Sequence, residues 1–249
     1  MNTREAKPGE APHRNTAIAA GVLYLITHVT SVGSFFLYGP ILTDARYIID
    51  AGPDTQVLMG VFFEVILALA VVGTSVALYP VVKRWSEGFA LGYVGLRTLE
   101  AGIIVVGVIP LLNVVTLRHL VGTTSTDSAA FITLGSALVE FHNWTVLLGP
   151  GLVCGVNTVL MAYLMYRSRL VPRFIPVLGL IGGPLVFALN TAKMFGIYEQ
   201  FPSWSAIAVL PIFAWEVTLA IWLIAKGFKS SEPAPEAALT TVNDLMSVA

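Results

Sequence analysis

The sequence predicts an all-α, polytopic membrane protein: a bundle of six transmembrane helices with both chain ends on the cytoplasmic side. Of its 249 residues, 56% are hydrophobic and only 12% are charged, and the mean hydropathy is +0.79. Soluble domains carry about 25% charged residues. A chain with half that share has too little polar surface to cover a water-exposed globule, so we expect it in the lipid bilayer.

Six apolar runs are long enough to cross the hydrocarbon core, which takes about 20 residues of helix. They cover residues 17–38, 56–82, 89–116, 142–166, 174–193 and 205–225. The first run ends at Gly39-Pro40, and the fourth contains Gly149-Pro150-Gly151. A proline inside a helix removes one backbone hydrogen bond, so the fourth span should kink there.

The remaining segments divide the chain into three parts. Residues 1–16 form a polar cytoplasmic segment, residues 17–227 the six-helix domain, and residues 228–249 a tail rich in Ala, Pro and Glu that we expect to be disordered. Two connections, 41–55 and 117–141, are long. The moderately apolar stretch 129–139 in the second is either a helix at the membrane interface or an extension of the fourth helix.

Lysine and arginine positions predict the orientation, because cytoplasmic loops carry the excess of positive charge. Ten basic residues lie at one end of the predicted bundle and three at the other, namely Arg46, Arg118 and Lys193. This bias predicts cytoplasmic chain ends and an inner-membrane location. The near-neutral net charge of −1 argues against a nucleic-acid partner.

Ionisable side chains within the apolar runs are the strongest functional signal, because they are costly in hydrocarbon and normally face a bundle interior. The candidate cavity residues are His28, Glu64, Arg97, Glu100, His142 and Glu216, and the secondary polar residues are Glu140, Asn190 and Lys193. Three of the cavity residues, His28, Glu100 and Glu216, fall 11 residues into their runs, near the membrane midplane. Glu64, Glu140, His142, Asn190 and Lys193 fall in the outer half of the membrane, which predicts an outward-opening cavity.

Spacing along the helices suggests contacts for these groups. Arg97 and Glu100 are three residues apart and should pair locally, although Arg97 could instead bridge to Glu64 or Glu216. A stripe in the first run is expected to face inward, because lipid offers polar groups no partner; it comprises Tyr24, His28, Ser31, Ser34 and Tyr38.

No metal or cofactor motif is visible. Glu140 and His142 are two residues apart and point to different sides of a helix, unlike a helical metal pair. The only cysteine, Cys154, lies in an apolar run and is expected to be a small buried hydrophobe. A metal site formed by His28, His142 and a glutamate would require tertiary folding to bring them together.

Several segments resemble the bacterial "domain of unknown function 4386" family. His142 opens a glycine-containing span that runs into Tyr166-Arg167-Ser168 and then Pro172-Arg173. Further similarity covers residues 19–25, 176–179 and 215–227, including Glu216. The resemblance implies a multi-pass bacterial membrane protein and no particular activity.

Three functions remain open from the sequence. The first is a small-solute or proton-coupled carrier or binding protein with a polar cavity near the midplane. The second is a membrane-embedded enzyme, with or without a bound metal, that uses His28 and His142 with carboxylates. The third is a regulatory or scaffold protein whose charges only lock helices together. The sequence identifies neither the solute, nor a cofactor, nor an oligomeric state.

Overall fold

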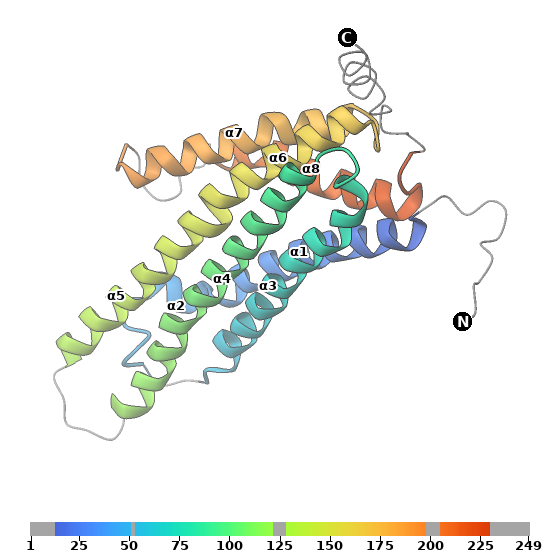
Figure 1. The fold of residues 1–249 in the computed structure, drawn as a ribbon. Coiled ribbons are helices and arrows are strands. Elements are labelled where there is room, and N and C mark those ends of the chain that lie inside the picture. The colour runs from blue at the N-terminus through green and yellow to red at the C-terminus, as the bar shows by residue number, and fades with distance from the viewer. Residues whose placement is uncertain (1–12, 51–52, 122–127, 198–204, 230–249) are drawn as a thin grey trace, which may run out of the picture.

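The computed structural model describes residues 13–50, 53–121, 128–197 and 205–229. Within these ranges all regular structure is helical, as predicted (Figure 1). The elements are α1 (Arg14–Leu37), α2 (Gly39–Thr43), α3 (Thr55–Val82), α4 (Glu87–Val121), α5 (Ser128–Val146), the π-helix η1 (Leu147–Val153), α6 (Cys154–Ser168), α7 (Phe174–Met194) and α8 (Ser205–Ala225). The predictions for residues 1–12 of the N-terminal segment and for residues 230–249 of the tail lie outside the described part of the chain.

Five helical segments are long and apolar enough to cross a membrane. They are α1, α3, α4, the continuous helix from α5 to α6, and α7. The described apolar part of α8, Val209–Ala225, is shorter. Apolar helices of this kind are those of an integral membrane protein, while the count of six spans remains a prediction.

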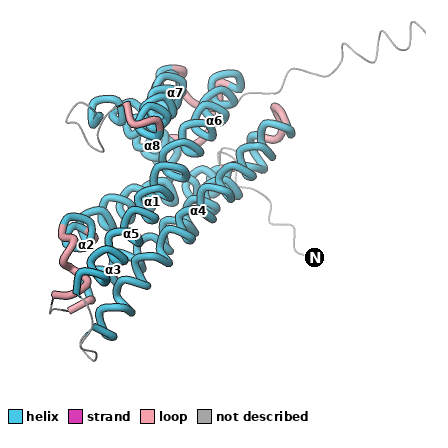
Figure 2. The backbone as a smooth tube through the Cα atoms, turned by 90° about the vertical axis from the view of Figure 1, so that its left-hand side faces the viewer, coloured by secondary structure: helices cyan, strands magenta, loops and turns pink. Residues whose placement is uncertain are grey.

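Neighbouring helices close into a ring. Following the contacts around the bundle, α1 packs on α3, α3 on α4, α4 on α6, α6 on α7 and α7 on α8. The ring closes because α8 also packs on α1, although the two helices lie at opposite ends of the sequence (Figures 1 and 2). Side chains that point into this ring from α1, α4, α6 and α8 can therefore meet.

The surface exposes large apolar side chains, and the mostly apolar interior also buries charged and polar side chains. Large apolar side chains such as Phe36 and Leu69 are 71% and 69% exposed. Arg97 and Glu100 are each only 3% exposed. This distribution suits lipid contact outside and polar contact inside.

The fourth span is longer than predicted, because the stretch 129–139 extends it. Residues Ser128–Ser168 form one helix of 41 residues, about 60 Å long at 1.5 Å per residue. The predicted irregularity at Gly149-Pro150-Gly151 is the π-helix η1. Close packing favours glycine there: a Cβ on Gly149 would lie 3.0 Å from Ile103, and one on Gly151 would lie 2.7 Å from Asn190.

One end of the bundle is fastened by Arg14. Its guanidinium donates to the carbonyls of Leu223 and Ile224 at 3.1 and 2.7 Å, so the start of α1 caps the last turn of α8. Both helix ends lie at the same end of the molecule (Figure 1). That placement suits the predicted orientation, which stays a prediction.

The prediction that a polar stripe of α1 faces inward is confirmed for most of its residues and wrong for Ser31. Tyr24, Ser34 and Tyr38 are buried, whereas Ser31 is exposed. The buried face passes through Thr27 and Thr30 instead, and both hydroxyls donate to backbone carbonyls of α1 itself. A step of 3.6 residues allows either neighbour to be buried, and packing against α3 and α8 decides between them.

Candidate functional site

Arg97 is the centre of a buried polar network, which we call the Arg97 network. Its Nη1 donates to Glu100 Oε2 at 3.1 Å and its Nη2 to Glu216 Oε1 at 3.0 Å. The sequence left open whether Arg97 pairs locally or bridges to another helix, and the structure shows both. Glu100 lies one turn along α4, whereas Glu216 comes from α8.

The third nitrogen of the guanidinium donates to a tyrosine hydroxyl, which is itself hydrogen-bonded to a second tyrosine. Arg97 Nε donates to Tyr93 Oη at 3.1 Å, and the Tyr93 hydroxyl lies 2.8 Å from that of Tyr24 on α1. The guanidinium carbon also lies 5.5 Å from the centre of the Tyr24 ring. Each nitrogen of Arg97 therefore donates one hydrogen bond, and three of the five N–H groups of this buried guanidinium have acceptors among the described residues.

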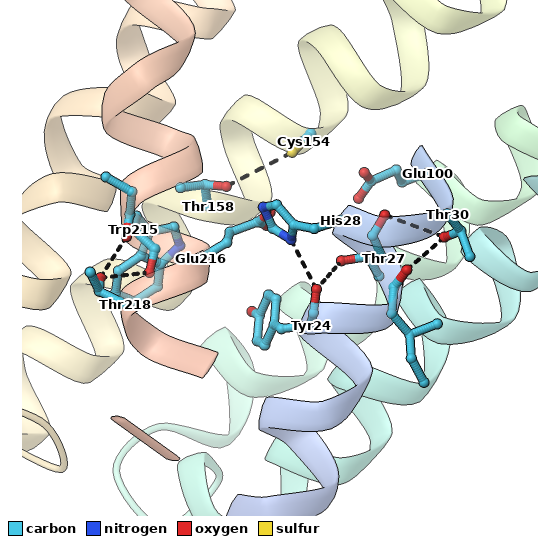
Figure 3. Close-up of polar contacts among 12 residues, drawn as sticks. Tyr24, Thr27, His28, Thr30, Glu100, Cys154, Thr158, Trp215, Glu216 and Thr218 are labelled. Carbon is cyan, nitrogen blue, oxygen red and sulfur yellow. Dashed lines mark hydrogen bonds and ion pairs between the residues drawn. The ribbon is translucent and has the colours of Figure 1, made fainter. Parts of the chain in front are cut away.

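His28 extends the network from α1 and has a defined tautomer. Its Nδ1 lies 2.9 Å from the carbonyl oxygen of Tyr24, which can only accept, so Nδ1 carries a proton. Its Nε2 lies 3.5 Å from Glu216 Oε2. Figure 3 shows His28 reaching from α1 toward Glu216 on α8, with the ring bonded back to Tyr24.

Asn157 of α6 completes the network from the other side. Its Nδ2 donates to Glu100 Oε2 at 2.6 Å, and the residue is fully buried. Its Oδ1 has no hydrogen-bond partner among the described residues. One turn earlier, Cys154 Sγ lies 4.0 Å from Thr158 Oγ1, and both side chains lie near His28 and Glu216 in Figure 3.

Glu64 and His142 form a separate group, which we call the Glu64 group. Tyr38 donates its hydroxyl to Glu64 Oε2 at 3.1 Å, and the Tyr38 ring meets that of His142 edge-on at 5.5 Å. His142 Nδ1 lies 2.9 Å from the carbonyl of Gly107. A small apolar cluster that includes Leu67 packs on α3 one turn beyond Glu64.

The secondary polar residues lie elsewhere again. Glu140 is exposed, accepts a hydrogen bond from Asn143 at 3.2 Å, and lines a hollow of about 200 Å³ between α2, α4 and α5. Asn190 donates to the carbonyl of Val186 and lies against Gly151. Lys193 is close enough to Glu140 for electrostatic interaction.

The histidines proposed for a metal-dependent enzyme belong to different groups. His28 is in the Arg97 network and His142 is in the Glu64 group. Within the described part of the chain, no three His, Cys, Asp or Glu side chains come together as ligands for a metal ion. The arrangement around Arg97 can instead exchange protons and offer oxygen acceptors to a small polar ligand.

Sequence reasoning missed two features of the polar interior. Asn157 gave no signal, because a single asparagine in an apolar run is usually a packing residue. The second feature is a clamp at the far end of α4, where Arg118 donates to Asp54 and to the Asp50 carbonyl and lies over the Tyr47 ring. The sequence marks Arg118 only as one of three basic residues at the end of the bundle opposite the predicted cytoplasmic end.

The family model described as "Domain of unknown function (DUF4386)" matches residues 19–227. Comparisons with curated proteins and with solved structures gave no significant match. The matched region covers most of the chain and contains every residue of the Arg97 network and of the Glu64 group. The chain therefore belongs to the DUF4386 family.

Proposed function

We propose that this protein is a proton-coupled carrier of small solutes in the bacterial inner membrane, with its proton held between His28 and Glu216. The observation that carries the proposal is the tautomer of His28. With Nδ1 protonated, a neutral ring presents its Nε2 lone pair to a carboxylate oxygen 3.5 Å away. One added proton turns this repulsive pair into a hydrogen bond, whichever of the two groups carries it.

The charge of the network supports the same assignment. One guanidinium faces two carboxylates, so with a neutral imidazole the formal charge is −1. A net charge is costly inside a bilayer. A single bound proton makes the network neutral, and a carrier needs such a neutral state to change conformation within lipid.

Accessibility separates a fixed part of the network from an exchangeable part. The side chains of Arg97 and Glu100 are only 4% and 5% exposed. Those of His28 and Glu216 keep 15% and 14% exposure. We assign the Arg97–Glu100 pair to holding the helices, and the His28–Glu216 pair to taking up and releasing the proton.

Glu64 and His142 are proposed to line the outward branch of the same route. Tyr38, which contacts both, directly precedes α2, and Glu140, with Lys193 near it, lines the hollow beside α2. The partners of Glu64 and His142, Tyr38 and the Gly107 carbonyl, fix their side chains. This assignment makes them secondary to His28 and Glu216 in proton binding.

A pH-jump experiment tests the proposal. Proteoliposomes adsorbed on a solid-supported membrane are stepped from pH 8 to pH 6, and the displaced charge is recorded. The wild type should give a transient current, and both Glu216→Gln and His28→Gln should reduce it to the level of empty liposomes. His119→Gln, which removes an exposed histidine at the end of α4, serves as the control and should keep the current.

The result also separates the carrier from a static lock. The other ionisable groups near the pair are Tyr24, Tyr93, Arg97, Glu100 and Cys154. If both variants keep the wild-type current, the proton resides on one of these or elsewhere, and the assignment fails. If the wild type gives no current and the variants only lower thermal stability, the network is a structural lock.

A further inference from the structure

Asn157 leaves an unused acceptor at the most buried point of the Arg97 network. The residue is 0% exposed, and its Oδ1 has no hydrogen-bond partner among the described residues. Its Nδ2 is already committed to Glu100 Oε2 at 2.6 Å. A buried acceptor without a donor is costly, so such an atom normally marks a missing water, ion or ligand.

Glu100 offers a second unused acceptor beside it. Both hydrogen bonds that Glu100 accepts from the described residues use Oε2, which leaves its Oε1 without a donor. Among the described residues, the hydrogen-bonding contact of the Thr158 hydroxyl, adjacent to Asn157 in sequence, is the long one of 4.0 Å to Cys154 Sγ. Each nitrogen of Arg97 donates one hydrogen bond, to Tyr93, Glu100 Oε2 and Glu216 Oε1, and neither Asn157 Oδ1 nor Glu100 Oε1 is among these acceptors.

Charge and hydrogen bonding together define the missing ligand. The site has a formal charge of −1 and free oxygen acceptors, so it is complementary to a small cation that carries N–H donors. We propose that the carrier binds ammonium, or the ammonium group of a small primary amine, between Asn157 and Glu100; this inference rests on the proposed function. An anion or a neutral acceptor would meet like charge or leave the two oxygens unpaired.

The same accounting explains how the solute is coupled to the proton. The network has one surplus negative charge, and either a proton on the His28–Glu216 pair or an ammonium group beside Glu100 neutralises it. Both together would leave a net positive charge in a low-dielectric interior. The two cations therefore compete, and release of the proton accompanies binding of the amine, which is the requirement for exchange across a membrane.

Thermal unfolding of the full-length protein in detergent tests the site directly. A ligand that binds only the folded state raises Tm in a saturable manner. We expect ammonium and methylammonium chloride to raise Tm at pH 8, and to raise it less at pH 5.5. Tetramethylammonium chloride and sodium chloride at equal ionic strength should not raise Tm, because neither cation carries N–H donors.

Three variants locate the effect. Asn157→Leu should abolish the ammonium-dependent rise by removing the free acceptor, and Glu216→Gln should abolish it by removing the surplus charge. Asn113→Leu makes the same change on an exposed face of α4 and should keep the rise. If Asn157→Leu does not fold, Asn157→Ala supplies the same comparison, because alanine also has no side-chain acceptor.

Native Cys154 provides a second, local readout. It is the only cysteine and lies one turn from Asn157, so bound ammonium should slow its alkylation by N-ethylmaleimide, measured by mass spectrometry. Equal Tm shifts for all four salts, or an undiminished ammonium shift in the Asn157 variant, would overturn the inference. An intact pH-jump current would then leave the proton carrier standing. Conversely, if the current is lost while ammonium binds independently of pH, the carrier is removed and the ammonium site remains.

Discussion

At the scale of single residues, Arg97 determines what the polar interior can do. It holds two carboxylates from different helices and is nearly inaccessible. Its pairing with Glu100 was predictable, because a separation of three residues places both on one helix face. Its contact with Glu216 was only one of several options, since the two residues are 119 positions apart and the sequence does not give the register of one helix against another.

Replacing Arg97 with glutamine should destabilise the protein strongly. The substitution leaves Glu100 and Glu216 buried without a countercharge, and breaking a buried ion pair on one side costs about 3–5 kcal/mol. The measurement is the Tm of the purified variant, compared with Arg84→Gln on an exposed turn, for which we expect a change within about 0.5 kcal/mol. Equal stability of the two variants would show that the network does not hold the helices.

At the scale of elements, glycines and the π-helix set how closely the helices approach. The sequence predicted an irregularity at Pro150, because proline lacks the N–H that a regular helix needs. It did not predict the π-helical form, because a proline alone does not specify how the helix rearranges around it. The continuous helix from Ser128 was one of two alternatives, and packing of α5 against α4 decided between them.

Gly107 and Gly102 offer a matched pair on α4. A Cβ on Gly107 would lie 2.1 Å from Thr145 Oγ1 and 3.5 Å from His142 Nδ1, whereas a Cβ on Gly102 would have no neighbour within 4 Å. Gly107→Ala should therefore lower stability by about 1–3 kcal/mol through overpacking. Gly102→Ala should be neutral or raise it by up to about 1 kcal/mol through helix propensity. Thermal unfolding measures both, and the opposite order would contradict the packing of α5 on α4.

The clamp at the far end of α4 predicts a pH effect outside the membrane-spanning segments. Burial raises the pKa of the Tyr47 phenol above its ordinary value of 10.0, the Arg118 charge opposes the shift, and the Asp54 carboxylate adds to it. A raised pKa in the folded state gives stability that is complete below about pH 10 and is lost as the pH rises through the folded value.

Tyr47→Phe isolates this contribution. The difference in Tm between the wild type and the variant should be constant up to about pH 9 and should fall between pH 10 and pH 12. A difference that is flat or grows up to pH 12 would show that Tyr47 is not buried in the clamp.

At the scale of the whole molecule, composition alone predicted the all-helical fold and the lipid environment. Ring closure was not predictable, because it depends on contacts between α1 and α8 at opposite ends of the chain. The grouping of the site residues was not predictable either, because it also depends on contacts between distant helices. All six candidate cavity residues are ionisable residues inside the apolar runs. Their positions in those runs do not separate the Arg97 network from the Glu64 group, which occupy different positions along the bundle.

The orientation predicted from basic residues can be tested with two introduced cysteines in a Cys154→Ser background. Asp44→Cys lies at the α2 end and Glu87→Cys at the opposite end, and both positions are exposed. A membrane-impermeant maleimide applied to intact cells should label position 44 only, because ten of the basic residues lie at the other end. Labelling of position 87 alone would reverse the topology.

The proton site depends on one feature, the tautomer and titration of the His28 ring beside Glu216. Nitrogen-15 NMR of histidine-labelled protein in nanodiscs measures it directly, with the His28 signals assigned from the His28→Gln variant. We predict that at high pH Nδ1 carries the proton and Nε2 is bare, and that acidification changes the Nε2 signal in the wild type but much less in Glu216→Gln. A neutral ring protonated at Nε2, or a titration that is identical with and without the Glu216 carboxylate, would contradict the account.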